Sequence, residues 1–266
     1  MRVIGLCRFS YPAIGGFKTT HTDTASREAY LYAPERLASR LRHFQALTLA
    51  SLRAQTDPDF TLLVLVGTSL PAPFRARLDA MVADVPQVRI IARPPGKHRQ
   101  VMQSLLLEEL GQGPPESIQF RLDDDDAVGV QFVERLRTLA HSSAKMRRPY
   151  RFFGIDYNHG YSAMLGPTGI RAEAVTPHMW SCGMALICGA GQTRTIMNVG
   201  HQKLHQMIPT LILPKPEMFV RGVHANNDSL KDPDTRRLRP LDATRSAYFK
   251  AQFNIDEALV KQLFQP

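Results

Sequence analysis

The sequence predicts an α/β fold in which a mostly parallel central sheet is flanked by helices and followed by a less regular C-terminal half. In the first half of the chain, apolar strand-like runs alternate with segments whose apolar residues recur every three to five positions. This alternation is typical of βαβ units around a parallel sheet. The apolar run at residues 60–66 ends at Gly67, as expected for a strand that is buried on both faces.

In the first half, each predicted strand is followed by a predicted helix. Pro34 lies near the first turn of the first helix, and Gly111 ends the third. Ligands of such sheets bind at the carboxyl ends of the strands, so the residues that follow each strand are candidates for a site. The strands cover residues 3–9, 60–66, 88–91 and 118–122, and the helices cover residues 34–55, 73–83, 97–110 and 130–140.

After residue 150 the alternation weakens, although apolar runs continue to the end of the chain. A helix is predicted at residues 199–207, and a last helix carries Ile255, Leu259 and Leu263. No linker is visible, which favours a single domain over residues 1–266. Strands are predicted at residues 151–157, 172–176, 211–213 and 219–223, with a further apolar run at residues 185–188.

A run of carboxylates, Asp123, Asp124, Asp125 and Asp126, directly follows the predicted strand at residues 118–122. We call these residues the acid cluster. Adjacent like charges repel, so burying them without a cation is costly. Hard carboxylate oxygens suit Mg²⁺ or Mn²⁺, which take further ligands from phosphates and water. The alternative is a solvated acidic turn, but the apolar segments on both sides favour the metal site.

Composition and charge narrow the function classes. The chain has 266 residues, a net charge of +9 and a pI near 9.7, which favours anionic partners such as nucleotide phosphates or lipid headgroups. No nucleic-acid-binding signature occurs, so nucleic acid is not expected as a partner. The apolar part of the N-terminus is too short for a signal peptide, and Cys7, Cys182 and Cys188 form no CxxC pair. We therefore expect a cytoplasmic protein, with peripheral attachment to a membrane surface as a further option.

Two motifs carry a resemblance to a known class. Ser51, Leu52, Gln55 and Thr56 form an "SL..QT" pattern before the strand at residues 60–66, and the acid cluster resembles a DxD signature at a strand end. In these features the chain resembles the GT-A class of nucleotide-sugar-dependent glycosyltransferases, and more closely the putative rhamnosyl transferase family. The resemblance covers roughly residues 3–225. It implies a nucleotide-binding half at residues 1–128, and an acceptor-binding half with a C-terminal tail at residues 129–266.

The resemblance also implies roles for the acid cluster. Asp125 would be the principal ligand of a Mn²⁺ or Mg²⁺ ion, and Asp123 would contact the metal or the donor ribose. Asp126 would hold the sugar or a metal-bound water, while Asp124 would be the variable middle residue. His224, at the end of a late strand, resembles a C-terminal histidine that supplies a further metal contact.

For the nucleotide, we expect three cationic residues to hold the donor, a dTDP-, UDP- or GDP-sugar. Arg8 ends the first predicted strand, and Lys97 and Arg99 follow the Pro94-Pro95-Gly96 loop. Ordinary surface charge is the alternative for each of them. Trp180, the only tryptophan, is expected either to stack on a sugar face or to lie in the core.

The catalytic base is less well defined. Members of the class that invert the anomeric centre often use a Glu-Asp pair, and no such pair follows residue 126. His201 is the candidate at the comparable place, because histidine titrates near neutrality. Asp156 is the carboxylate alternative. Without a defined base, whether the reaction inverts or retains the anomeric configuration stays open.

The sequence thus predicts a metal-dependent glycosyltransferase that moves a sugar, rhamnose by the resemblance, to a glycan or lipid-linked acceptor. Two alternatives stay open. A sugar nucleotidyltransferase also uses acidic metal sites on α/β folds, although its usual glycine-rich first loop is missing here. A non-enzymatic module with a structural divalent-metal site is the other, and the spacing excludes an EF-hand.

Overall fold

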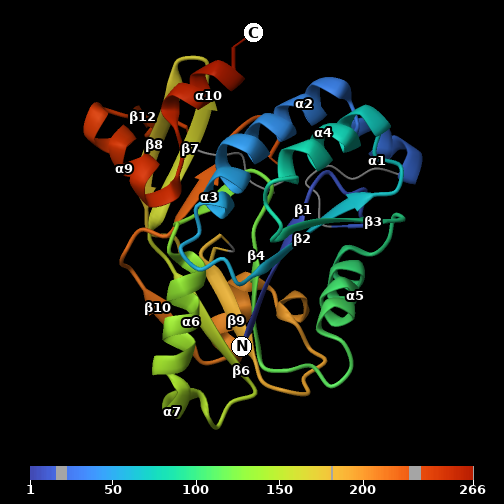
Figure 1. The fold of residues 1–266 in the computed structure, drawn as a ribbon, viewed down its shortest axis with the longest axis vertical. Helices are drawn as coiled ribbons and strands as arrows, with labels where there is room; N and C mark the ends of the chain where they lie inside the picture. The colour runs from blue at the N-terminus through green and yellow to red at the C-terminus, as the bar shows by residue number, and fades with distance from the viewer. Residues whose placement is uncertain (16–22, 181, 228–234, 266) are drawn as a thin grey trace.

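The computed structural model describes residues 1–15, 23–180, 182–227 and 235–265, and these residues form two sheets with helices packed around them (Figure 1). The first sheet has the strand order β10-β6-β9-β4-β1-β2-β3. Its strands are β1 (Arg2–Arg8), β2 (Thr61–Gly67), β3 (Val88–Arg93), β4 (Ser117–Arg121), β6 (Phe152–Tyr157), β9 (Met184–Cys188) and β10 (Thr210–Leu213).

Most neighbouring strands of the first sheet run parallel, which confirms the predicted fold class. β1 lies between β4 and β2 and is parallel to both, so its carboxyl end meets theirs at one edge. β9 is the exception, because it runs antiparallel to β4 and β6. The sequence reflects this arrangement: β1, β2 and β9 are apolar along most of their length because both faces of the sheet are covered. β4 is buried as well, although it carries the polar Ser117 and Gln119.

The second sheet has the strand order β12-β8-β7-β11-β5 and packs beside the first. The sequence pattern did not predict it as a sheet, although the strands corresponding to β8 and β11 were predicted. β7 was missed because its residues alternate between buried and half-buried and begin and end with glycine. β5 was missed because it is short and begins within the acid cluster. The strands are β5 (Asp126–Val128), β7 (Gly160–Gly166), β8 (Gly169–Val175), β11 (Phe219–Gly222) and β12 (Arg239–Pro240).

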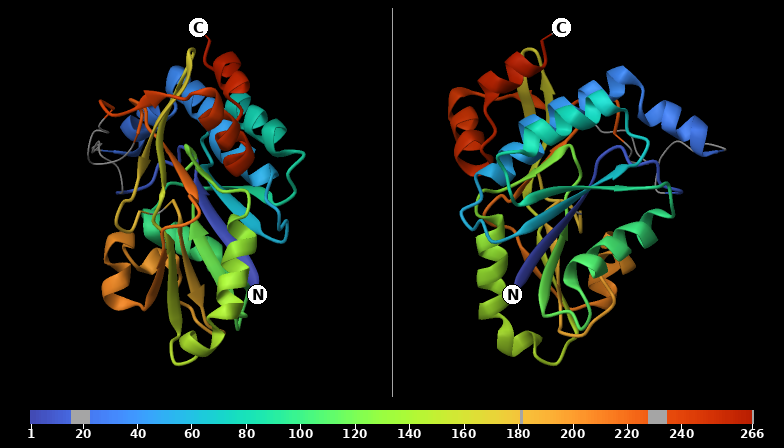
Figure 2. Two further views of the ribbon diagram at one scale, coloured as in Figure 1. Left: turned by 90° about the vertical axis from the view of Figure 1, so that its left-hand side faces the viewer. Right: turned by 45° about the vertical axis from the view of Figure 1, so that its right-hand side comes forward.

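Helices cover both faces of the first sheet (Figure 2). One face packs against apolar residues of α2, α4 and α6, and the other against α5 and α8. The helices are α1 (Thr24–Leu31), α2 (Pro34–His43), α3 (Ala50–Arg53), α4 (Ala72–Val82), α5 (His98–Leu110), α6 (Phe132–Ser142), α7 (Ala144–Arg147), α8 (Leu204–Met207), α9 (Ala243–Phe253) and α10 (Glu257–Leu263). A π-helical segment, η1 (Phe44–Leu49), and the 3₁₀ segments η2 (Ile196–Asn198) and η3 (His201–Lys203) complete the set that the described residues form.

Two predicted helices differ from the observed ones. The helix predicted at residues 34–55 is a single helical run made of α2, η1 and α3, in which η1 adds a π-helical segment. The helix predicted at residues 199–207 is instead the 3₁₀ segment η3 followed by the short α8, since Gly200 is extended rather than helical. Among the described residues, no helix is both long and apolar enough to cross a bilayer.

Candidate functional site

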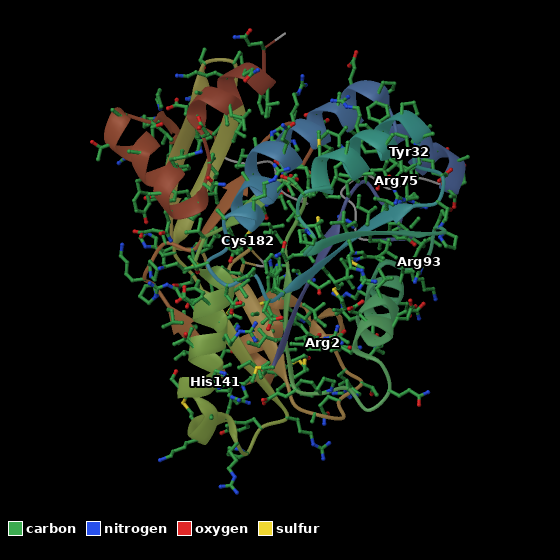
Figure 3. The ribbon with its side chains drawn as sticks, in the orientation of Figure 1. Arg2, Tyr32, Arg75, Arg93, His141 and Cys182 are labelled. Atoms are coloured by element: carbon green, nitrogen blue, oxygen red, sulfur yellow. The ribbon has the colours of Figure 1, made fainter. Side chains whose placement is uncertain are left out.

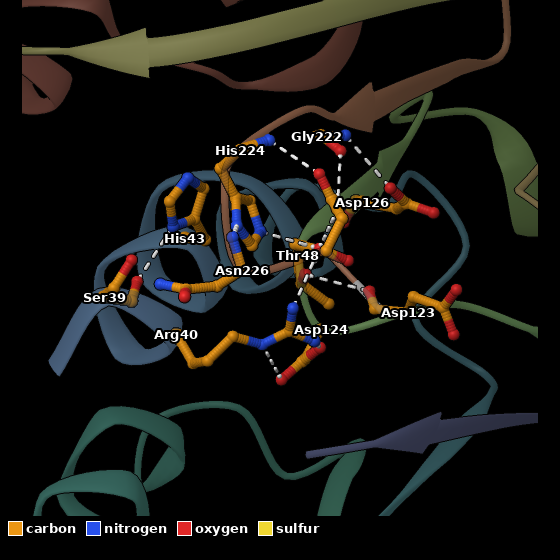
Figure 4. Close-up of polar contacts among 12 residues, drawn as sticks. Ser39, Arg40, His43, Thr48, Asp123, Asp124, Asp126, Gly222, His224 and Asn226 are labelled. Carbon is orange, nitrogen blue, oxygen red and sulfur yellow. Dashed lines mark hydrogen bonds and ion pairs between the residues drawn. The ribbon is translucent and has the colours of Figure 1, made fainter. Parts of the chain in front are cut away.

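The acid cluster lies at the carboxyl end of β4, in the middle of the first sheet. The backbone N–H of Leu122 still donates to Leu6 in β1, and the chain then turns into the second sheet through β5. Asp124, Asp125 and Asp126 are buried, whereas Asp123 is exposed and its carboxylate points away from that of Asp124 (Figure 4). The cluster therefore joins the two sheets, and most of it is part of the interior.

The polar residues of the "SL..QT" pattern and of η1 hold this connection in place. Thr48 donates to the carbonyls of Asp126 at 2.8 Å and of Asp123 at 3.3 Å. Gln55 donates to the carbonyl of Gly129 at 2.9 Å and accepts from the N–H of Val133 at 3.1 Å. The motif thus positions the backbone on both sides of the acid cluster. This is a structural role that the sequence resemblance did not assign.

Arg40, on α2, neutralises the centre of the acid cluster. Its guanidinium forms a two-pronged ion pair with Asp124, in which Nε lies 3.0 Å from Oδ2 and Nη2 pairs with Oδ1. Its Nη1 also lies 3.0 Å from Oδ2 of Asp125. All three side chains are buried, and a buried ion pair needs this kind of hydrogen-bonded geometry to offset the loss of hydration.

Asp125 receives further donors from the loop after β11. His224 Nε2 and Asn227 Nδ2 each lie 2.8 Å from its Oδ2, the same oxygen that pairs with Arg40. Burial alone would raise the pKa of Asp125, but Arg40 and the His224 hydrogen bond outweigh burial and hold that pKa below its ordinary value. Asp125 is therefore an ionised carboxylate with protein donors already around one oxygen.

Asp126 serves as an acceptor for the backbone of the second sheet. Its Oδ1 accepts from the N–H of Gly222 at 3.0 Å, and Sγ of Cys182 lies 2.9 Å from Oδ2. Residue 222 must be glycine here, because a Cβ would overlap the Asp125 carbonyl. Burial raises the pKa of Asp126, and the charge of Asp125 raises it further.

Metal binding at Asp125 and His224 would need a ring nitrogen of His224 that is free to coordinate the ion. The structure brings Asp125 and His224 together, but the His224 Nδ1 accepts a backbone N–H from Asn226 at 3.1 Å. Nε2 of the neutral ring must then carry the proton, whereas a metal-bound histidine donates from its other nitrogen. Over the described part of the chain, no three His, Cys, Asp or Glu side chains are grouped as a metal site. In this arrangement Asp125 and His224 do not fit a metal ion, and metal binding by Asp123 stays a prediction.

A group of cationic side chains lies beside the acid cluster on the α5 side of the sheet. We call Arg8, Arg99, Arg121 and Arg221 the arginine cluster. Arg8 and Arg121 end the adjacent parallel strands β1 and β4, where Leu6 is the register partner of Arg121. Burial lowers the pKa of Arg121, and Arg99 and Arg8 lower it further while the nearby Asp123 opposes them.

The same arginines act on the histidines around them. His98, at the start of α5, has its pKa lowered to about 3 by burial and by the charges of Arg8, Arg121 and Arg99. Arg221 lies over the Trp180 ring, with 4.6 Å between its guanidinium carbon and the ring centroid. Trp180 thus packs between the arginine cluster and Phe219 in the second sheet, and it is half-buried.

The predicted nucleotide-binding residues are placed differently from one another. Arg8 and Arg99 belong to the arginine cluster. Lys97 is exposed at the start of α5, where its backbone pairs with Ile14 and its side chain forms no ion pair with a described residue. Asp123, at the edge of the acid cluster, is the predicted acidic residue nearest to Arg121. Nucleotide binding by these residues stays a prediction.

His201 contacts the arginine cluster directly. Nη2 of Arg121 lies 3.0 Å from Nδ1 of His201, and since a guanidinium can only donate, Nδ1 must be the acceptor. The pKa of His201 is lowered to about 4 by burial and by Arg121, Arg221 and Arg99. The neutral ring then carries its proton on Nε2 and has no lone pair left for an acceptor hydroxyl. This geometry gives His201 the role of holding Arg121, and its role as a base stays a prediction.

Asp156, the alternative base, lies on β6 in the same face of the sheet as Met184. It is almost fully buried, its Oδ2 has no hydrogen-bond partner in the described structure, and the backbone of Met179 donates to the carboxylate. Burial raises its pKa from 3.8 to about 7, only partly offset by the Met179 hydrogen bond. An unpaired oxygen with a pKa near neutrality suits a general base.

Sequence reasoning missed two arginines that organise the site. Arg40 carries a detectable signal, because it lies on the apolar stripe of α2 between Leu37 and Leu41, where a cation needs a buried partner. Arg121 is the last residue of β4, directly before the acid cluster. Its own signal is weak, since an arginine at a strand end is common on protein surfaces.

Fold and site together define the class. A mostly parallel α/β sheet with carboxylates at the carboxyl end of a central strand is the architecture of the GT-A class. The chain belongs to the family described as "Putative rhamnosyl transferase", whose model matches residues 2–236.

The solved structures named here share little sequence with the chain. No protein with a curated function matches it. Among solved structures, TarS residues 1–349 of S. aureus in complex with UDP-GlcNAc is 9% identical, with a TM-score of 0.46 over 86% of this chain and 60% of that one. The same TarS segment in complex with UDP is 10% identical, with a TM-score of 0.46 over 84% of this chain and 61% of that one. The chain thus spans about three fifths of these TarS chains.

Proposed function

We propose that the protein is a glycosyltransferase that moves a sugar, rhamnose by its family, from a nucleotide-sugar donor to an acceptor hydroxyl. The observation that carries this proposal is the arginine cluster at the carboxyl ends of β1 and β4, next to the exposed Asp123. Ligands of parallel sheets bind at this edge, and guanidinium groups there suit a diphosphate. Membership of the rhamnosyl transferase family supports the same reading.

Sugar transfer requires cations beside the diphosphate and a base beside the acceptor hydroxyl. The bond between the anomeric carbon and the β-phosphate oxygen breaks, and that carbon forms a new bond to the acceptor oxygen. The nucleoside diphosphate leaves with the electron pair of the broken bond, and the acceptor proton passes to a base. Cations fixed beside the diphosphate stabilise the charge that develops there without reorganising during the reaction.

For the base we propose Asp156. Its pKa of about 7 leaves a substantial ionised fraction at neutral pH, and its unpaired Oδ2 can accept a proton. His201 is the weaker candidate of the two, because its pKa of about 4 and its Arg121 contact leave it little proton affinity. A carboxylate base implies an inverting reaction, in which the acceptor attacks from the face opposite the diphosphate.

The predicted Mn²⁺ or Mg²⁺ ion would, if bound, neutralise the diphosphate of the donor. Of the predicted ligands, only Asp123 has a carboxylate that no described side chain engages. The steps proposed here therefore use only side chains of this chain. Whether a metal ion also takes part is testable by comparing activity with Mn²⁺ and with EDTA.

The positive net charge of the protein suggests a class of acceptor. The net charge of +9 favours an acceptor presented on an anionic surface, such as a lipid-linked glycan at a membrane. This would make the protein peripheral to the membrane and cytoplasmic, in keeping with the sequence-based expectation. The structural-metal alternative gains no support, because Arg40 already balances the buried carboxylates that such an ion would occupy.

The test is release of sugar from dTDP-rhamnose, UDP-GlcNAc and a GDP-sugar by the purified protein, measured as nucleoside diphosphate produced. We expect one donor to be hydrolysed slowly to water without an acceptor, and Asp156→Asn to lose this activity while still binding the nucleotide. If none of the donors binds or reacts, the transferase proposal fails. Pyrophosphate release from a sugar phosphate and a nucleoside triphosphate would instead establish the nucleotidyltransferase alternative.

A further inference from the structure

The acid cluster and the arginine cluster differ in how far their charges are already balanced by protein partners. In the acid cluster, each buried carboxylate already has protein partners: Arg40 for Asp124 and Asp125, and the backbone of Gly222 for Asp126. A metal ion bound at Asp125 Oδ2 would have to displace the three donors on that oxygen, one of them a buried guanidinium. Such a displacement would leave Arg40 buried against a cation, which is costly.

Two members of the arginine cluster, Arg99 and Arg121, show the opposite condition. Within the described residues, neither Arg99 nor Arg121 forms an ion pair with a carboxylate, and the hydrogen-bond partner of Arg121 is the neutral ring of His201. The Arg99 side chain lies beside Gly200, with Nη2 3.9 Å from the position of a Cβ on that glycine. Asp123 offsets part of the repulsion between the charges of Arg8, Arg99 and Arg121, and a bound anion would offset more of it.

A second, independent feature of this place also favours an anion. α5 begins here at His98, and no side chain caps its N-terminus. Over its 13 residues the helix presents the positive end of its dipole to the same space. Arg99 lies in the first turn of α5, so the helix N-terminus and the guanidinium groups converge on one ligand.

We propose that the arginine cluster, rather than a divalent metal ion, binds and neutralises the diphosphate of the donor, and that sugar transfer proceeds without a metal. Guanidinium groups bind phosphate oxygens through two parallel hydrogen bonds, and they remain charged at all working pH values. Arg121 is the central residue, because its Nη2 contacts His201 and its charge acts together with those of Arg8 and Arg99 on His98. The inference rests on the proposed function, because it assigns the cation that stabilises the departing diphosphate.

The probe for the inference is inorganic pyrophosphate, titrated calorimetrically into the full chain in buffer with EDTA. We expect binding without metal, and adding excess Mn²⁺ instead of EDTA should not strengthen it. Arg121→Gln and the exposed Arg99→Gln should each weaken binding about tenfold or more, since each removes charge-assisted hydrogen bonds. Arg93→Gln is the matched control, because Arg93 ends β3 at the far side of the sheet and pairs with Glu108 (Figure 3).

The outcomes separate the inference from the proposed function. Binding only with Mn²⁺, or unchanged affinity in both Arg121→Gln and Arg99→Gln, would overturn the arginine assignment. If Arg121→Gln fails to fold, Arg99→Gln decides, because its side chain is exposed at the start of α5. Metal-free pyrophosphate binding with no turnover of any nucleotide sugar would overturn the transferase function instead, while turnover that requires Mn²⁺ would leave the function intact and overturn this inference.

Discussion

The acid cluster and the arginine cluster lie side by side at one edge of the first sheet, but they are built in opposite ways. The carboxylates of Asp124, Asp125 and Asp126 are buried and surrounded by donors from α2, β11 and the loop after it. Arg121 and Arg99 are gathered from β4 and α5, with a neutral histidine and an uncapped helix terminus as their surroundings. The buried carboxylates have cationic or backbone donors within the protein, whereas Arg99 and Arg121 form no ion pair with a carboxylate of the described residues.

A run of acidic residues in a sequence therefore does not by itself indicate a metal site. In this protein the acids join two sheets and hold the loop that carries His224 and Asn227. The ligand-binding potential lies in the cations next to them. Substitutions in and around the two clusters can test whether the acid cluster is structural and whether the arginine cluster is functional.

The largest effect on stability is expected for Arg40→Met. The substitution leaves the carboxylates of Asp124 and Asp125 buried without their cation, which typically costs about 3–5 kcal/mol in the free energy of unfolding. Urea unfolding followed by circular dichroism measures this cost. A loss of less than about 1 kcal/mol would show that the cluster does not depend on Arg40.

The matched control is Arg53→Met. Arg53 also forms a two-pronged pair, with Asp84, but both side chains are exposed. Exposed pairs contribute at most about 1 kcal/mol. We also expect Mn²⁺ not to restore the stability of Arg40→Met. If Mn²⁺ restored the stability of Arg40→Met, the carboxylates would form a metal site in which the Arg40 guanidinium takes the place of the ion.

The second-largest effect concerns Asp156, whose titration makes the free energy of unfolding depend on pH. Its pKa is raised from 3.8 to about 7 in the folded protein, so folding favours the protonated form. The stability linked to this proton is present below pH 4 and is lost as the pH rises through about 7. Asp156→Asn should therefore gain stability relative to the original protein, from near zero at pH 4 to about 4 kcal/mol at pH 8.

The same variant separates a functional carboxylate from a structural one. Asp156→Asn should be more stable than the original protein at pH 8 yet strongly impaired in sugar release. In the unsubstituted protein, the rate of sugar release should rise with pH through about 7, as the base loses its proton. A stabilised variant with full activity would remove Asp156 as the base.

The smallest effect is expected on the pKa of His201 when Arg121 is replaced. Arg121→Gln removes a positive charge that, together with burial, lowers the pKa of His201 to about 4. We therefore expect the pKa of His201 to rise in the variant, measured by NMR titration of its ring protons. An unchanged pKa would show that Arg121 and His201 are not neighbours in solution, which would weaken the description of the arginine cluster.

Much of the fold could be predicted because local patterns carry it. The strands β1, β2, β3 and β4 and the helices α2, α4 and α5 follow from apolar runs and their spacing, and the structure confirms them, whereas α1 was not predicted. The second sheet could not be predicted as a sheet, because its pairings join β5 with β11 and β7 with β8, and β5 and β7 have no clear apolar signature.

The site was only partly predictable for the same reason. The location of the acid cluster at the end of a strand was predicted, and Arg8 and Arg99 were selected as cations near it. The partner of the acids is Arg40, 84 positions before Asp124, and Arg121 meets His201 80 positions later. Such contacts depend on the packing of α2 and η3 against the sheet, which no local pattern encodes.

The most direct test of this account is a crystal structure with bound nucleoside diphosphate, grown with excess Mn²⁺ and measured at a wavelength where manganese scatters anomalously. We expect the diphosphate to lie within hydrogen-bond distance of the Arg121 and Arg99 guanidinium groups, with no manganese peak at Asp125. A manganese ion bound by Asp125 and His224, bridging to the phosphates, would contradict it.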